Sequence, residues 1–131
     1  MAIEKAAVIG GGTMGNGIAQ VIAQSGIEVT LVDIDAAALT RATDRIKANL
    51  ERLASREKIS SDDVAATLGR LSTSTDLEEA GAAADHVVET VIEDFDVKSD
   101  VLSRLDKVCR EDVILASNTS QFSITKLAAT T

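Results

Sequence analysis

Three glycines near the N-terminus have the spacing of a phosphate-binding loop. Gly10, Gly12 and Gly15 form the pattern G-x-G-x-x-G within the stretch VIGGGTMGNGIAQ, directly after the apolar residues 6–9. In such a loop the first glycine allows a tight turn, the second lets the backbone approach a pyrophosphate, and the third lets a helix pack closely on a strand. The first N–H groups and the dipole of that helix favour a phosphate. The pattern predicts a dinucleotide-binding loop, and a glycine-rich turn without a ligand is the alternative.

An acidic residue follows at the distance expected for a ribose-binding carboxylate. Asp33 lies 21 residues after Gly12, at the end of a second β-branched run. Its carboxylate could accept hydrogen bonds from a ribose diol and would repel a 2′-phosphate. The next five residues contain no Arg or Lys, so the sequence favours NAD(H) over NADP(H). The alternative is that Asp33 caps the following helix, but Asp35 suits that task better.

The predicted roles of the three glycines and of Asp33 require strands and helices that alternate along the chain. Helix signals are an N-cap at Asp35, a near capping box from Ser60 to Asp63, and a stop at Gly26. This order predicts an α/β fold, a Rossmann-like doubly wound parallel sheet with a helical hairpin inserted after strand 2. The expected strands cover residues 6–9, 28–34, 71–74, 86–92 and 113–117, and the expected helices cover 14–25, a long segment after 35, 60–69, 76–83, 96–108 and 124–129.

Apolar spacing also predicts which faces of two helices are buried. In the first helix Met14, Ile18, Val21 and Ile22 lie on one side, and in the helix over 96–108 the packed residues are Val97, Val101, Leu102 and Leu105.

Composition limits the possible functions. The 131 residues are 45% hydrophobic, contain no proline and carry a formal charge of −8, as expected of one globular domain or part of one. The negative charge argues against a nucleic-acid partner or a membrane surface, and no segment is apolar and long enough to span a membrane. Cys109 is the single cysteine and cannot form an internal disulfide. We therefore expect a cytoplasmic protein, with no metal-binding residues and with Cys109 as a small buried hydrophobic residue.

Four stretches of the chain resemble the N-terminal domain of the L-3-hydroxyacyl-CoA dehydrogenases, particularly the bacterial 3-hydroxybutyryl-CoA type. They are VIGGGTMGNGIAQ, VTLVDID, HVVETVIEDFDVKSDVLSRLD and VILASNTSQFSITKLA. The resemblance implies an oxidoreductase of fatty-acid or short-chain acyl-CoA metabolism that oxidises the 3-hydroxyl of an acyl-CoA to a 3-keto group. The hydride passes to NAD⁺. The chain departs from the family at Gln121, which stands where the family usually has the second serine of N-T-S-S.

The resemblance also implies site residues. Ser120 matches the active-site serine whose hydroxyl hydrogen-bonds the 3-oxygen of the substrate, and Glu93 and Lys98 match positions on the ribose and nicotinamide side of the cofactor. Glu89 is left open, because it could turn toward the cofactor or be a partnered structural carboxylate. The cofactor-binding residues expected from the motif and the resemblance are Gly10, Gly12, Thr13, Met14, Gly15, Asp33, Glu93, Lys98 and Asn118.

A general base is missing from this set. In the family, a histidine in an H-x-F-N-P segment follows the stretch that ends at Thr131, and His86 stands at a strand start on the wrong side of the expected sheet. We therefore expect residues 1–131 to be an NAD-binding domain, apparently truncated, without the C-terminal helical domain that supplies much of the acyl-CoA site and a homodimer interface. Such a fragment would bind NAD(H) and turn over little. By the same resemblance, Arg41, Arg45 or Lys58 could meet the phosphates of CoA.

Two other functions remain open from the sequence. One is another NAD-dependent hydroxyacid dehydrogenase on the same scaffold, such as a relative of the 3-hydroxyisobutyrate or 6-phosphogluconate dehydrogenases. The other is a non-catalytic NAD-binding or structural protein that kept the fold.

Overall fold

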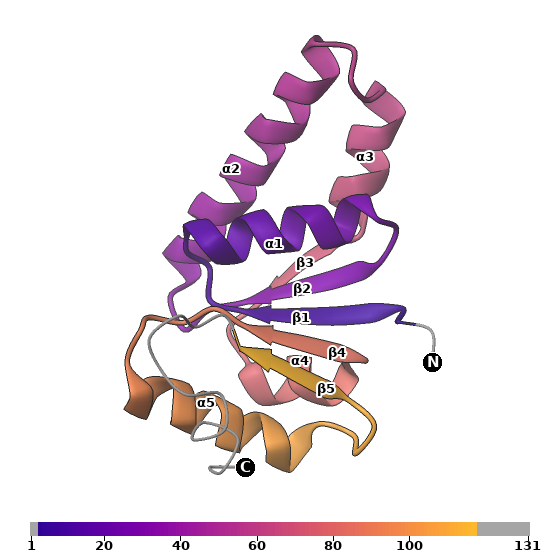
Figure 1. Cartoon of the computed structure of the whole chain (residues 1–131). Coiled ribbons are helices and arrows are strands. Elements are labelled where there is room, and N and C mark those ends of the chain that lie inside the picture. The colour runs from indigo at the N-terminus through magenta and orange to yellow at the C-terminus, as the bar shows by residue number, and fades with distance from the viewer. Residues whose placement is uncertain (1–2, 118–131) are drawn as a thin grey trace.

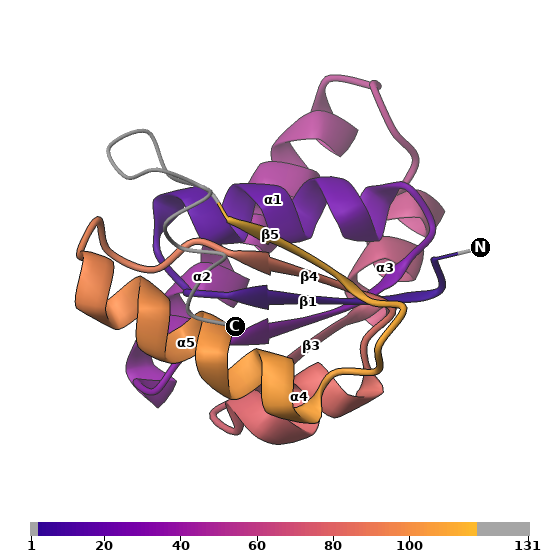
Figure 2. The same ribbon diagram turned by 60° about the horizontal axis from the view of Figure 1, so that its bottom comes forward.

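Five parallel strands form one sheet in the computed structural model, which describes residues 3–117 (Figure 2). Their order across the sheet is β3-β2-β1-β4-β5. The chain order reverses between β1 and β4, and in such sheets ligands bind beyond the carboxyl ends of the strands at this point. The strands are β1 (Lys5–Ile9), β2 (Glu28–Val32), β3 (Leu71–Ser74), β4 (His86–Glu89) and β5 (Ile114–Ser117).

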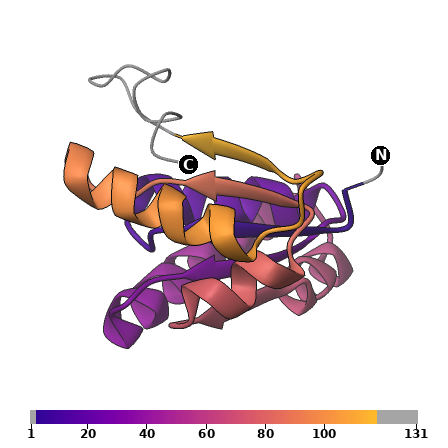
Figure 3. The ribbon, with the colours of Figure 1, turned by 90° about the horizontal axis from the view of Figure 1, so that it is seen from below.

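Helices cover both faces of the sheet, which confirms the predicted doubly wound α/β fold (Figure 1). One face carries α1 (Thr13–Gln24) together with α2 (Ala36–Ser55) and α3 (Ser61–Gly69). The α2–α3 pair extends away from the sheet as the predicted helical hairpin (Figure 1). The opposite face carries α4 (Leu77–Ala83) and α5 (Phe95–Val108), which lie side by side (Figure 3).

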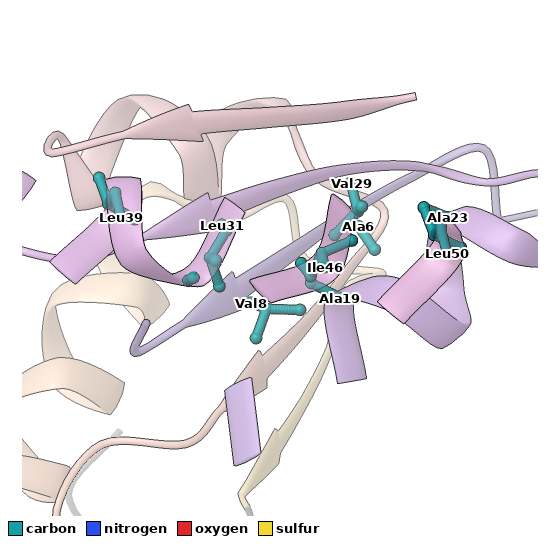
Figure 4. Packing of buried hydrophobic residues seen from close by; sticks show 10 residues of the cluster. Ala6, Val8, Ala19, Ala23, Val29, Leu31, Leu39, Ile46 and Leu50 are labelled. Carbon is teal, nitrogen blue, oxygen red and sulfur yellow. The ribbon is translucent and has the colours of Figure 1, made fainter. Parts of the chain in front are cut away.

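The core is divided by the sheet into two clusters. Side chains of successive strand residues point to opposite faces, so Ala6 and Val8 of β1 pack toward α1 and α2, while Ala7 and Ile9 pack toward α4 and α5. Figure 4 shows the first cluster, in which Ile46 is among the α2 residues that meet β1 and β2. Because both faces are covered, β1 is apolar along its buried length.

Local signals in the sequence place the helix ends as predicted. Asp35 caps α2 by accepting a hydrogen bond from the N–H of Ala37 at 2.9 Å. Ser60 and Asp63 form a reciprocal capping box at the start of α3, and these hydrogen bonds lower the pKa of the Asp63 carboxyl. Gly26, with φ of +96°, follows the end of α1.

Two strands end earlier than the sequence predicts. The strand expected over 28–34 ends at Val32 and the one expected over 86–92 ends at Glu89. The next residue of each segment still bonds across the sheet, because the N–H of Asp33 donates to Ser74 and the N–H of Thr90 donates to Ile9. After that the backbone leaves the ladder, and the N–H groups of Asp35 and Val91 donate to the side chains of Asp33 and Glu89.

The predicted apolar face of α1 is wrong in part. Met14 is 56% exposed and Val21 is 65% exposed, although Ile18 and Ile22 pack against the core. The helix instead approaches the sheet through its small side, where Gly15, Ala19 and Ala23 are buried. Small side chains allow the closest approach, so they and not the larger apolar residues determine which side faces the sheet. In α5, Val97 is likewise half-exposed, whereas Val101, Leu102 and Leu105 are buried as predicted.

Candidate dinucleotide-binding site

The glycine loop joins the carboxyl end of β1 to the first turn of α1, beside the point where the strand order reverses. Gly10 has φ of +113°, a conformation that favours glycine, and a Cβ at this position would lie 2.7 Å from Thr90 Oγ1. A Cβ on Gly15 would lie 1.8 Å from the carbonyl oxygen of Gly10. These two glycines therefore have the predicted roles of a tight turn and a close helix–strand approach.

Gly12 differs from both because the protein itself does not require a glycine there. It is the N-cap of α1 with φ of −73° and ψ of −170°, which any residue adopts, and a Cβ would meet nothing within 4 Å. The space in front of it adjoins the first turn of α1, where N–H groups lack partners within the helix. The arrangement fits a pyrophosphate lying against the backbone of Gly12 and Thr13.

Asp33 lies directly beside this loop. Its Oδ2 accepts a hydrogen bond from the N–H of Gly11 at 2.8 Å, and its Oδ1 accepts one from the N–H of Asp35 at 2.9 Å. A carboxylate has about four acceptor positions, so it can still receive hydrogen bonds from a ribose. Since Asp35 is the residue that caps α2, the helix-cap alternative for Asp33 is not needed.

A pocket of about 670 Å³ connects these features. Its apolar walls come from the ends of β1, β2 and β4 and from α5, and they include Ile34, Val91 and Val101. Arg41 and Arg45 of α2 also line it, and Arg45 Nη1 donates to Thr13 Oγ1 at 3.0 Å. Arg41 is 69% exposed, which agrees with the solvated helix face expected from the sequence. Because α2 passes the glycine loop, both arginines also lie beside the pocket.

A buried charged cluster lies at the carboxyl ends of β4 and β5. Lys98 of α5 and Glu89 of β4 are both 0% exposed, and Lys98 Nζ lies 2.7 Å from Glu89 Oε2. The same ammonium lies 3.2 Å from Glu93 Oε1, and the Glu93 side chain is 29% exposed. Glu89 is therefore a partnered carboxylate, which is one of the two roles that the sequence left open.

The structure brings together some of the predicted residues and leaves others undescribed. Met14, although it belongs to the loop motif, points into solvent from α1 and does not line the pocket. Asn118 and Ser120 lie outside the described residues. His86 begins β4 and pairs with Ala6, so it stands at the end of the sheet opposite the glycine loop, as predicted.

Within residues 3–117 no group of His, Cys, Asp or Glu could hold a metal ion, and no helix is long and apolar enough to cross a membrane.

Two residues that support the loop carried no recognisable signal in the sequence. The hydroxyl of Thr90 donates to the carbonyl oxygen of Ile9 at 2.9 Å, and its N–H donates to the same oxygen at 2.8 Å. Asn16 is buried, and its side-chain amide donates to the carbonyl oxygen of Gly12 at 3.1 Å. Asn16 comes directly after the last glycine of the motif, and Thr90 falls inside the strand expected over 86–92, so neither could be singled out.

The Cys109 thiol is expected to alkylate slowly in the folded protein. Burial, followed by the nearby Asp106, raises the thiol pKa. Each unit by which a thiol pKa rises lowers the thiolate fraction about tenfold at a pH below it. At pH 7.5 we expect iodoacetamide to react at least several-fold more slowly with the native protein than with the same protein in urea, and the native rate to rise with pH. Equal rates in the two states would contradict this expectation.

The sheet order, the glycine loop and the carboxylate after β2 together define a dinucleotide-binding domain of the doubly wound class. The family model described as "3-hydroxyacyl-CoA dehydrogenase, NAD binding domain" matches residues 5–131. The chain belongs to this family, and its cofactor is NAD.

Relatives of known activity agree with this assignment. The chain is 46% identical over 127 residues to a 3-hydroxyadipyl-CoA dehydrogenase of Escherichia coli, covering 97% of this chain and 26% of that protein. It is 41% identical over 131 residues to a 3-hydroxybutyryl-CoA dehydrogenase of Mycobacterium tuberculosis, covering 99% of this chain and 46% of that protein. These proteins are dehydrogenases of acyl-CoA substrates, and the chain corresponds to a quarter to a half of their length.

Solved structures give the same result for the fold. The crystal structure of 3-hydroxybutyryl-CoA dehydrogenase from Escherichia coli superposes with a TM-score of 0.95 at 45% identity, covering 98% of this chain and 27% of that one. The (S)-3-hydroxybutyryl-CoA dehydrogenase from Ralstonia eutropha superposes with a TM-score of 0.94 at 42% identity, covering 99% and 46%.

Proposed function

We propose that this chain binds NAD(H) as the dinucleotide-binding part of an enzyme that oxidises the 3-hydroxyl group of a 3-hydroxyacyl-CoA. The observation that carries the proposal is Gly12, whose conformation any residue could adopt and whose missing Cβ opens onto the pocket beside Asp33. A glycine that the fold does not require, at the N-terminus of a helix, is explained by a ligand that lies against the backbone.

In this proposal the parts of the dinucleotide would lie in the pocket in a definite order. Asp33 would accept hydrogen bonds from the hydroxyls of the adenosine ribose, and the apolar walls near Ile34 and Val101 would contact the adenine. The pyrophosphate would lie against Gly12 and the first turn of α1. The second half of the dinucleotide would then extend across the switch point toward the carboxyl ends of β4 and β5.

NAD⁺ supplies the hydride acceptor for this reaction. Oxidation of a secondary alcohol also needs a general base within hydrogen-bond reach of the hydroxyl. His86 is the single histidine of the sequence and stands at the opposite end of the sheet. We therefore propose that the base, the greater part of the acyl-CoA site and a homodimer interface come from residues outside this sequence. Ser120 would bind the substrate oxygen, Asn118 would border the cofactor pocket, and a cytoplasmic location is part of the same proposal.

Gly12→Val tests whether the open space in front of Gly12 receives the cofactor. Valine is compatible with the backbone conformation of residue 12, so the variant is expected to fold, while its side chain occupies the space proposed for the pyrophosphate. In isothermal titration we expect the unaltered chain to bind NADH and not NADPH, and Gly12→Val to lose at least about tenfold in NADH affinity, which corresponds to ~1.4 kcal/mol.

A matched control lies on the same helix. Gly17 also faces open space, but it does not line the pocket, so Gly17→Ala should bind NADH as the unaltered chain does. Unchanged NADH affinity in Gly12→Val, or absence of NADH binding by the folded unaltered chain, would refute the proposed function.

A further inference from the structure

Glu89 makes contacts that no part of the glycine loop explains. Its Oε2 accepts from Lys98 Nζ and from the N–H of Val91, both at 2.7 Å. Its Oε1 accepts from the hydroxyl of Ser117 at 2.6 Å. One carboxylate thus connects the end of β4, the end of β5, α5 and the loop that follows β4.

Lys98 extends this connection to the pocket side. Besides Glu89, its ammonium donates to the carbonyl oxygen of Val91 at 3.2 Å and lies 3.2 Å from Glu93 Oε1. Lys98 is completely buried, whereas Glu93 is partly exposed, so Glu93 presents the accessible end of this cluster to solvent. Val91 is itself a wall of the pocket.

The position of the cluster indicates which half of the dinucleotide it serves. In doubly wound sheets the strands on either side of the switch point form two mononucleotide-binding halves. Asp33 follows β2 and belongs to the adenosine half, whereas Glu89 and Ser117 end β4 and β5 in the other half. Hydrogen bonds to ionised groups are about twice as strong as neutral ones, so the charge on Glu89 fixes Lys98 more firmly than a neutral acceptor would.

We propose that Glu89 is a positioning residue for the nicotinamide half of the cofactor site, acting through Lys98 on Glu93 and on the wall at Val91. The proposal rests on the proposed function, since it names a residue of the same site. Glu89 itself contacts no ligand in this scheme. The negative charge of Glu89 holds the ammonium of Lys98 in place, and this ammonium in turn orients the partly exposed carboxylate of Glu93.

Glu89→Gln tests the proposal because it keeps the size of the side chain and removes the charge. We expect the NADH affinity of the chain to fall about tenfold, because a less firmly held Lys98 no longer orients Glu93 and one charged hydrogen bond to the cofactor is lost. The affinity for ADP, which contains the adenosine half and the pyrophosphate but neither the second ribose nor the nicotinamide, should change less than twofold. A purely structural role for Glu89 would alter both affinities together or neither.

Asp85→Asn is the matched control, because Asp85 directly precedes β4 and Glu89 is the last residue of that strand. Asp85 accepts from the N–H groups of Glu4 and Lys5, each at 3.0 Å, and pairs with Arg110, but it is remote from the pocket. This variant should leave the ratio of NADH affinity to ADP affinity unchanged. If Glu89→Gln does not fold, Glu89→Gln combined with Lys98→Gln removes both fully buried charges and takes the ammonium only from the partly exposed Glu93. This variant should show the same selective loss.

The possible outcomes separate the two proposals. If the unaltered chain binds ADP and NADH but the Glu89 variants change both affinities equally, or neither, the positioning role is refuted while the proposed function stands. If the unaltered chain binds neither compound, the proposed function fails and the positioning role fails with it.

Discussion

Gly15→Ala is expected to destabilise the protein strongly, although it adds a single methyl group. That methyl would lie 1.8 Å from the carbonyl oxygen of Gly10 and 2.8 Å from Thr90 Oγ1. The nearest obstacle is backbone, so it cannot be relieved by a side-chain rotation. Overpacking typically costs ~1–3 kcal/mol, and we expect about 3 kcal/mol or more here because β1 and α1 would have to separate. Urea unfolding followed by circular dichroism measures the loss.

Gly17→Ala provides the control for this prediction. Gly17 lies two residues further along the same helix, and a Cβ there meets nothing within 4 Å. Alanine has a higher helix propensity than glycine by ~1 kcal/mol, so Gly17→Ala should stabilise the protein by up to that amount. Equal effects of the two substitutions would show that helix propensity, and not the approach of α1 to β1, decides the cost at residue 15.

The sequence predicted those parts of the site that depend on backbone requirements within a short segment. The glycine spacing, the apolar run before it and the carboxylate of Asp33 are close together along the chain, and each follows from one local geometric need. Helix caps at Asp35 and Ser60 were predictable for the same reason, because a capping side chain bonds an N–H two or three residues away. The doubly wound parallel sheet then followed from the alternation of strands and helices.

Contacts between distant segments could not be predicted in this way. Glu89 and Ser117 are opposite each other in the register of β4 and β5, and this register is set by the packing of the whole sheet. The orientation of α1 was mispredicted in part for a related reason. Periodicity identifies the apolar residues Met14 and Val21, but it does not show that the smallest side of the helix approaches the sheet most closely.

Lys98→Met is the second substitution for which we expect a large effect. Methionine approximates the length of lysine and suits a buried site, but it leaves Glu89 buried without its cation, at 0% exposure and near the second carboxylate of Glu93. Removing one partner of a buried ion pair typically costs ~3–5 kcal/mol, because the remaining charge has neither solvent nor counterion. We expect a loss of this size in urea unfolding at pH 7.

The double variant Glu89→Gln with Lys98→Met distinguishes an orphaned charge from lost packing. It has the same methionine but no buried carboxylate at residue 89, so it should recover a large part of the stability that Lys98→Met loses. If the single and double variants are equally unstable, the cost comes from packing and from the hydrogen bonds to Val91 and Ser117. Recovery would show that the attraction between Glu89 and Lys98 roughly offsets the cost of burying both charges. A neutral pair could then replace the ion pair without a large loss of stability. The presence of two buried charges next to the pocket wall at Val91 would then be explained by the proposed cofactor positioning, which a stable but neutral cluster would not supply.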